Sequence, residues 1–469
     1  MRRTHVAPGL GIAVVVLTVI AGLDAGLAAS PGRSLAFASE PEAASAVAAP
    51  QVVPVLDPAT GGRSPGRTQI RQALSRPLSD PALTGPVGVS VADGSSGQVR
   101  YAADAGRPLM PASTLKLLTA VTALDSLGSD DRLVTRVVMP TRGHLVLVGG
   151  GDPTLTAEPV HSGPADARPA STAALAATTA RTLRRAGRRR VSLSYDASLF
   201  TGPAVNPRWP PDYVTSGVVA PVVALMVDEG RVTPTSDERV ADPALSAAQT
   251  FARQLGDHGI EVVGPVFATR PKPGGSAMGR ATPVASVESA PMAVIVARML
   301  DDSDNQVAEG LGRLAALESG QPASFRGASA ALLGAAVQRH LPVTGWRVFD
   351  ASGLSRDDRA TAGGLVATVA MAVSDPSLAP IVAGLPVAGF TGTLADRYLS
   401  RPQSSAAGVV RAKTGTLTGS SAEVGLLVTS RGRLLAFALV AGAVPAPATD
   451  AARAALDRAA AALVTAGTP

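Results

Sequence analysis

The chain contains no cysteine in its 469 residues, and this absence limits how the fold can be stabilised. Disulfide scaffolds, zinc fingers, iron–sulfur sites and thiol nucleophiles are all excluded. The fold must depend instead on a hydrophobic core. The composition suits this, because 46% of the residues are apolar and only 17% are charged. At roughly 100 to 200 residues per domain, the length predicts two to four domains.

The N-terminal residues have the form of an export segment. Two arginines, Arg2 and Arg3, precede a mostly apolar run from Val6 to Leu23, the order of charges and apolar residues found in secretory signals. We predict that residues 1–30 are either a cleaved signal peptide or a retained anchor that tethers the chain through residues 6–23. Residues 31–66, rich in Pro, Ala, Gly and Ser, are predicted to be a spacer. Both alternatives make the rest of the chain extracytoplasmic.

The positive charge does not predict a nucleic acid partner. The net charge is +6 and the pI is about 10.2, but aromatic residues, which base stacking would require, are only 3% of the chain. We interpret the main basic cluster as a solvated helix face or a general polyanion contact. The basic cluster consists of Arg181, Arg184, Arg185, Arg188, Arg189 and Arg190.

The five histidines show no metal-ligand spacing, so we expect neither a metal nor a cofactor.

The periodicity of the chain predicts one domain interrupted by an insertion. Residues 134–285 mix short strands with Pro and Gly turns and are expected to form an inserted region with its own small core. Residues 67–133 and 286–469 would then form a single domain. Its expected elements are helices at 68–78, 113–127, 290–300, 306–317 and 449–464, and hairpins at 86–102 and 422–441.

Lysine is rare in this chain, which has 39 arginines but only Lys116, Lys272 and Lys413. Lys116 stands three residues after Ser113 at the start of a predicted helix, so the two side chains share one helix face. Burial would lower the pKa of Lys116, and its neutral amine could then take the hydroxyl proton of Ser113, which arginine could not do. The alternative is a helix cap followed by a surface lysine.

Two further patterns have both a chemical and a structural interpretation. Lys413-Thr414-Gly415 precedes a predicted strand, where a cation, a hydroxyl and a close backbone approach can bind a peptide carboxylate. It can equally be a turn that enters a strand. Ser303-Asp304-Asn305 lies between two predicted helices and offers a hydroxyl and an amide, or an ordinary helix N-cap.

Together, the three patterns in this order resemble the D-alanyl-D-alanine carboxypeptidase/endopeptidase family of low-molecular-mass, class C penicillin-binding proteins. The resemblance extends from Pro86 to about Gly442, and 190 residues separate Ser113 from Ser303, which leaves room for the insertion. It implies an α+β fold like that of penicillin-binding proteins and serine β-lactamases, an antiparallel sheet flanked by helices. The insertion would add one or two small β-rich subdomains. Other matching segments are Pro111–Thr119, Leu147–Leu155, Asp350–Arg356, Leu385–Gly389, Gly392–Leu394 and Val410–Leu417.

The resemblance also implies a role for each motif residue. Ser113 would attack the carbonyl between two D-alanines, with Lys116 as its general base. Ser303 and Asn305 would relay protons and hold the substrate amide. The remaining implied residues are Lys413, Thr414, Gly415 and Thr416 around the substrate carboxylate, and the backbone N–H groups of Ser113 and Thr416 as an oxyanion hole.

The implied activity is an exported serine carboxypeptidase, with endopeptidase action left open, that hydrolyses peptidoglycan stem peptides at the cell wall and is inhibited by β-lactams. Two alternatives remain, a serine β-lactamase and a non-catalytic cell-wall binding protein. One departure from the family pattern is Ala351, where a glycine is more usual, and we expect it to be tolerated. The sequence leaves the oligomeric state open.

Overall fold

A computed structural model describes residues 64–269 and 281–467 of the chain. The predicted export segment, nearly all of the predicted spacer and Lys272 therefore lie outside the described residues. Within these residues no single helix is long and apolar enough to cross a membrane, although one sharply bent pair, Ala362–Ser374 with Pro376–Ala383, passes by length and composition.

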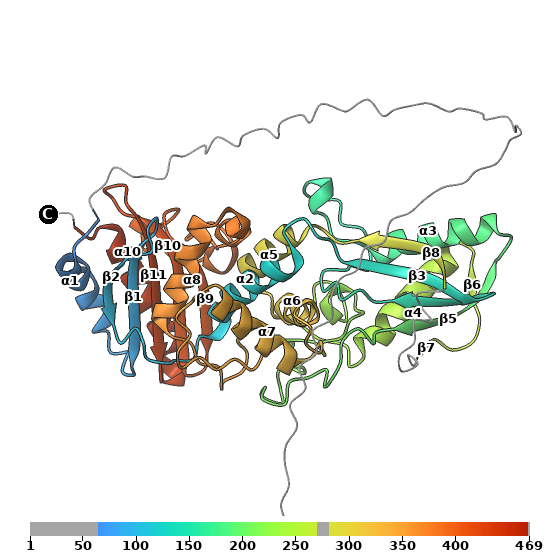
Figure 1. The fold of residues 1–469 in the computed structure, drawn as a ribbon, viewed down its shortest axis with the longest axis horizontal. Helices are drawn as coiled ribbons and strands as arrows, with labels where there is room; N and C mark the ends of the chain where they lie inside the picture. The colour runs from blue at the N-terminus through green and yellow to red at the C-terminus, as the bar shows by residue number, and fades with distance from the viewer. Residues whose placement is uncertain (1–63, 270–280, 468–469) are drawn as a thin grey trace, which may run out of the picture. The chain divides into compact units, whose positions relative to one another are not determined.

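One antiparallel sheet joins the two ends of the described chain. The strand that begins it, β1 (Val87–Asp93), pairs with β11 (Leu434–Gly442) near the C-terminus. Figure 1 shows these first and last strands, blue and red, side by side. The predicted hairpins are confirmed, with β2 (Val99–Ala103) following β1 and β10 (Ser420–Val428) preceding β11. The order is β2-β1-β11-β10-β9, so β9 (Arg411–Leu417) is an edge strand.

Helices cover both faces of this sheet, which is why β10 and β11 read as nearly continuous apolar runs. Along β11, Ala436 and Ala438 belong to one core cluster, and Phe437 and Leu439 belong to the other. The second cluster is closed by α1 (Arg67–Leu78) and α10 (Thr449–Val464). The first is closed by α2 (Lys116–Leu127), α5 (Met292–Asp301), α6 (Asn305–Glu318), α7 (Phe325–Gln338), α8 (Ala362–Ser374) and the short α9 (Ala379–Ala383).

The predicted α+β class is confirmed, and all five expected helices are present. Four agree with the expected bounds within two residues, and α2 begins three residues later, after a 3-10 turn. Helices α7 and α8 were not predicted. Their many small residues, such as the alanines of Phe325–Gln338, give little amphipathic contrast, because both helices are packed on several sides.

The insertion forms a single mixed sheet with one core. Its strands run in the order β6-β5-β4-β3-β8, with β7 also paired to β5, and the pairs β4–β5 and β5–β6 are parallel. Two helices, α3 (Thr172–Arg185) and α4 (Pro243–Asp257), pack into the same core. The strands are β3 (Val134–Thr141), β4 (His144–Val148), β5 (Arg190–Asp196), β6 (Glu261–Val262), β7 (Phe267–Ala268) and β8 (Thr282–Glu288).

The insertion has the expected strands, and two helices add much of its core. A parallel neighbour such as β5 needs a crossover connection after β4, and α3 supplies it. The sequence predicted α3 only as a solvated arginine face, without its bounds or its place in the core. Arg181, Arg184 and Arg185 are exposed on this helix, in agreement with the interpretation of a solvated helix face, whereas Arg190 opens β5 and pairs with Glu261.

The sheet core should be sensitive to cavity formation. Phe437→Ala removes a ring that is fully buried in β11, and we expect the free energy of unfolding to fall by about 3–5 kcal/mol. Phe267→Ala removes a ring that is 51% exposed and should change the free energy of unfolding by about 0.5 kcal/mol or less. Denaturant unfolding of both variants measures the difference, and equal effects would contradict the packing described.

Candidate active site

Ser113 lies on a short 3-10 turn, Ala112–Leu115, that leads directly into α2. Ala112, the residue before it, has a left-handed backbone with φ of +47°, a conformation rare for a residue with a side chain. Two glycines hold this turn closely. A Cβ on Gly415 would lie 2.6 Å from the carbonyl oxygen of Pro111, and one on Gly353 would lie 2.0 Å from that of Ala112. The nucleophile turn is therefore fixed between β9 and the 350–356 loop.

The Lys116 amine is fully buried and touches three oxygen atoms. Its Nζ lies 3.0 Å from Ser113 Oγ, 2.7 Å from Asn305 Oδ1 and 2.8 Å from the carbonyl oxygen of Ser352. The predicted contact between Lys116 and Ser113 is therefore present, and the alternative of a surface lysine is wrong.

Burial lowers the pKa of Lys116 to about 8, because the charged amine loses its hydration. The carboxylates of Asp350, Asp304 and Glu309 oppose this effect. A neutral amine has two N–H donors and one lone pair. The oxygens of Asn305 and Ser352 can accept only N–H groups, so they take both donors and leave the lone pair directed at the Ser113 hydroxyl.

The three residues of Ser303-Asp304-Asn305 separate into different tasks. Asp304 is the N-cap of α6, where its carboxylate accepts the backbone N–H of Val307, so the structural interpretation is correct for this residue. Asn305 accepts a hydrogen bond from the Lys116 amine on its Oδ1. Ser303 has φ of +57° and is half-buried, and its hydroxyl forms no hydrogen bond with any described residue. It lines a polar cavity together with Asn305.

Strand β9 offers an open edge beside the nucleophile. The N–H of Ala412 donates to the carbonyl oxygen of Pro386, on the side away from β10. Since alternate residues of a strand direct their backbone groups to the same side, the N–H groups of Thr414 and Thr416 also face away from β10. Thr416 is exposed, and the backbone N–H of Ser113 lies close to Gly415. The two predicted oxyanion donors therefore lie on segments that approach each other closely, the nucleophile turn and β9.

Lys413 is fully buried, and its amine donates to the carbonyl oxygen of Thr414 at 2.9 Å. Burial lowers the pKa of Lys413 well below its usual range, and the cations of Lys116 and Arg397 lower it further. Among the described residues no carboxylate lies within ion-pair distance of this amine. An anionic ligand beside this amine would favour its charged form, because the ligand would replace the hydration lost on burial.

Sequence reasoning missed several residues that complete the site. Glu309 is fully buried, and its Oε1 accepts the backbone N–H groups of Ala351 and Ser352 and the hydroxyl of Ser352. It therefore fixes the loop whose carbonyl receives Lys116. Thr393 contacts the hydroxyl of Thr414 at 2.9 Å. Ser352 and Thr393 lie in two of the segments that resemble the family, 350–356 and 392–394, but no pattern in the sequence indicated a role for Glu309.

The structure accommodates Ala351 at the position where the family more usually has a glycine. Its methyl group is buried against Gly312 of α6, where a second Cβ would lie only 2.5 Å away. The missing side chain at position 312 thus makes room for the additional methyl group.

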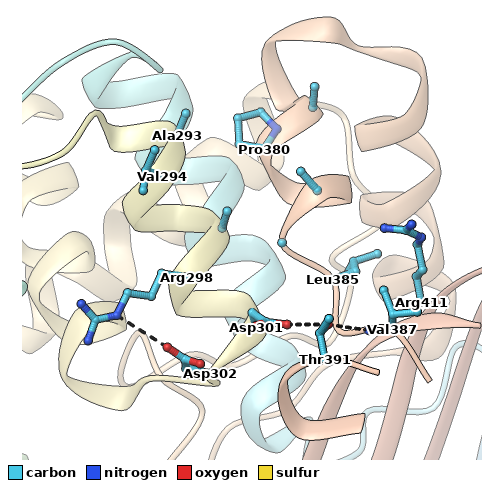
Figure 2. Close-up of a pocket in the computed structure, with 14 residues that line it drawn as sticks. Ala293, Val294, Arg298, Asp301, Asp302, Pro380, Leu385, Val387, Thr391 and Arg411 are labelled. Carbon is cyan, nitrogen blue, oxygen red and sulfur yellow. Dashed lines mark hydrogen bonds and ion pairs between the residues drawn. The ribbon is translucent and has the colours of Figure 1, made fainter. Parts of the chain in front are cut away.

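A separate cavity of about 890 Å³ lies between α5 and the 379–391 segment. Figure 2 shows Ala293, Val294 and Leu385 along it, with Asp301 bonded to Thr391 at one end. None of Ser113, Lys116 and Lys413 lines this cavity, so it is not the catalytic cleft. The described residues also contain no group of three or more acidic or histidine side chains that could hold a metal ion.

Comparison with known proteins agrees with this geometry. The model of the D-Ala-D-Ala carboxypeptidase 3 (S13) family matches residues 70–239 and 235–463. The chain belongs to this family. The resemblance predicted from the three motifs is thereby confirmed.

Curated relatives and a solved structure extend the match. Carboxypeptidase DacB of Mycolicibacterium smegmatis is 36% identical over 451 residues, covering 94% of this chain and 93% of the relative. Carboxypeptidase Rv3627c of Mycobacterium tuberculosis is 37% identical, with 83% and 82% covered. The crystal structure of penicillin binding protein 4 (dacB) from Haemophilus influenzae is 20% identical, has a TM-score of 0.65, and covers 79% of this chain and 93% of its own. The predicted fold is confirmed by this structural likeness.

The close approach at Gly415 gives a test of the site geometry. Gly415→Ala places a methyl group against the Pro111 carbonyl, so β9 and the nucleophile turn must move apart. We expect the rate constant of penicillin acylation to fall by about 100-fold. Gly106→Ala is the control, because a Cβ there would meet no atom within 4 Å. Stopped-flow acylation measures both, and equal rates for the two variants would contradict the close approach.

Proposed function

We propose that the chain is an exported serine D-alanyl-D-alanine carboxypeptidase that acts on peptidoglycan stem peptides, with endopeptidase cleavage of cross-links left open. The observation that most supports this is the buried Lys116 amine, with two oxygen acceptors and Ser113 Oγ within 3.0 Å. This arrangement suits a general base that acts without histidine.

The reaction begins with proton transfer from Ser113 to Lys116. Ser113 Oγ attacks the carbonyl carbon between the two D-alanines, and the oxyanion is stabilised by the backbone N–H groups of Ser113 and Thr416. The C–N bond then breaks, and the leaving amine takes the proton held by Lys116. The half-buried Ser303 hydroxyl, free of hydrogen bonds to described residues, is suited to pass this proton on. Water hydrolyses the acyl-enzyme.

The terminal carboxylate of the substrate would lie beside Lys413, Thr414 and Thr416. The buried Lys413 amine has no acidic partner among the described residues, so a substrate carboxylate beside it would favour its charged form. Thr393 orients the hydroxyl of Thr414 toward the same place. Asn305 is bonded to Lys116 and would also contact the substrate amide.

Two parts of the proposal rest on the sequence and on relatives. The location at the cell wall, with or without a membrane tether, follows from the charged and apolar pattern of residues 2–23. Inhibition by β-lactams is supported by the Haemophilus influenzae relative, which has been solved in complex with a β-lactam, with a TM-score of 0.58. The β-lactam would acylate Ser113 in place of the peptide.

Mass spectrometry after incubation with penicillin, and separately with a pentapeptide ending in D-Ala-D-Ala, tests the function. We expect one penicillin adduct on Ser113 and loss of one D-alanine from the peptide. Ser113→Ala should show neither. Lys116→Arg, with its rate normalised to the folded fraction from thermal unfolding, should lose about 10²–10⁴-fold in acylation rate because arginine cannot act as the base.

Other outcomes would favour the alternatives. Rapid multiple turnover of a chromogenic cephalosporin, without release of D-alanine, would indicate a β-lactamase. Binding of peptidoglycan without an adduct or product would indicate a non-catalytic binding protein.

A further inference from the structure

The insertion reaches the catalytic residues through its backbone. The amide Nδ2 of Asn305 donates to the carbonyl oxygen of Val218 at 3.0 Å. The next residue, Gln306, accepts the backbone N–H of Ala220 on its Oε1 at 2.9 Å. The first two residues of α6 are thus bonded to alternate residues of one segment of the insertion.

The bond to Val218 determines the orientation of the Asn305 amide. An amide presents an acceptor oxygen at one position and a donor NH₂ at the other. With Nδ2 on the Val218 carbonyl, Oδ1 faces Lys116 at 2.7 Å. A flipped amide would place carbonyl against carbonyl at Val218 and NH₂ against the N–H groups of Lys116. The direction of the Lys116 lone pair therefore depends on where Val218 lies.

Two polar side chains hold this segment. Gln306 is 2% exposed, and its Nε2 has no partner among the described residues, so its bond to Ala220 is the only one its side chain makes there. From within the insertion, Arg239 donates to the carbonyl oxygens of Gly217 at 3.1 Å and Glu229 at 2.9 Å. Its guanidinium is nearly fully buried.

The same part of the insertion shares a core with the catalytic domain. Val219 and Trp209 pack in one cluster with Phe325 of α7 and Leu354 of the 350–356 loop. The Trp209 indole N–H also donates to Asp350 at 2.7 Å. Apolar packing thus brings the segment near the site, and the polar bonds set its register.

We infer that Gln306 is a positioning residue: by holding the insertion against α6, it lets the Val218 carbonyl fix the Asn305 amide and thereby aim the Lys116 amine at Ser113. This inference rests on the proposed function and assigns the insertion a part in the chemistry. Gln306 itself does not touch Lys116 or Ser113 by any hydrogen bond of the described residues.

Gln306→Met tests the inference, because methionine has a similar volume and lacks the acceptor oxygen. We expect the first-order rate constant of penicillin acylation to fall by about 10–100-fold, with little change in the dissociation constant of the pre-acylation complex. Gln306→Glu should recover most of the rate. The glutamate keeps one side-chain oxygen that accepts the backbone N–H of Ala220, and burial should keep its carboxyl group neutral. The loss of Nε2 removes no hydrogen bond, because Nε2 has no partner among the described residues.

A control and a second variant separate positioning from general stability. Arg184→Met removes another arginine–carbonyl bond of the insertion, to His258, that has no connection to Asn305, and should acylate like the wild type. Arg239→Met should slow acylation without altering any residue of α6. All rates are normalised to the folded fraction, which thermal unfolding measures. If Gln306→Met folds poorly, the rate of Arg239→Met tests the inference instead.

The outcomes distinguish this inference from the proposed function. Wild-type acylation rates in both folded Gln306→Met and Arg239→Met, or no recovery in folded Gln306→Glu, would overturn the positioning role. A wild-type protein that forms no adduct would instead overturn the proposed function.

Discussion

The site depends on keeping one lysine amine out of water. Lys116 is fully buried at the start of α2, and burial lowers its pKa to about 8. An isolated buried charge would be very costly, so burial favours the neutral base, although a pKa of about 8 still leaves most of the amine protonated at pH 7. Helices α2, α5 and α6 and the sheet pack around this polar amine. The amine is tolerated there because oxygens of Asn305 and Ser352 accept its N–H groups.

Each of those two oxygens is held by a different part of the chain. The Ser352 carbonyl belongs to a loop fixed by the buried carboxyl of Glu309. The Asn305 oxygen is oriented from the insertion, through Val218. A small shift of either support would turn the lone pair away from Ser113, and misplacement by about 1 Å can cost 100-fold in rate. The insertion and the catalytic domain are therefore best regarded as one functional unit.

The sequence predicted the parts of the site that have a local cause. Ser113 and Lys116 are three residues apart on one helical turn, and Gly415 allows a close approach that only a residue without a side chain permits. The supports could not be predicted this way. Glu309 lies one helical turn after Asn305, but its bonds to the 350–356 loop, like the bond of Val218 to Asn305, are tertiary contacts that no local pattern in the sequence indicates. In the fold, the two hairpins were predictable from apolar segments around turn residues. The alanine-rich α7 was not predicted, and α3 was predicted only as a solvated helix face.

The scarcity of lysine allows the central claim to be measured directly. With only three lysines in the chain, protein labelled with ε-¹³C-lysine should give three resolvable NMR signals, and Lys116→Arg identifies the one that belongs to Lys116. We predict that this signal titrates with a midpoint of about 8. A midpoint at the ordinary lysine value of about 10.4 would contradict the account, because Lys116 would then remain charged and could not act as the base.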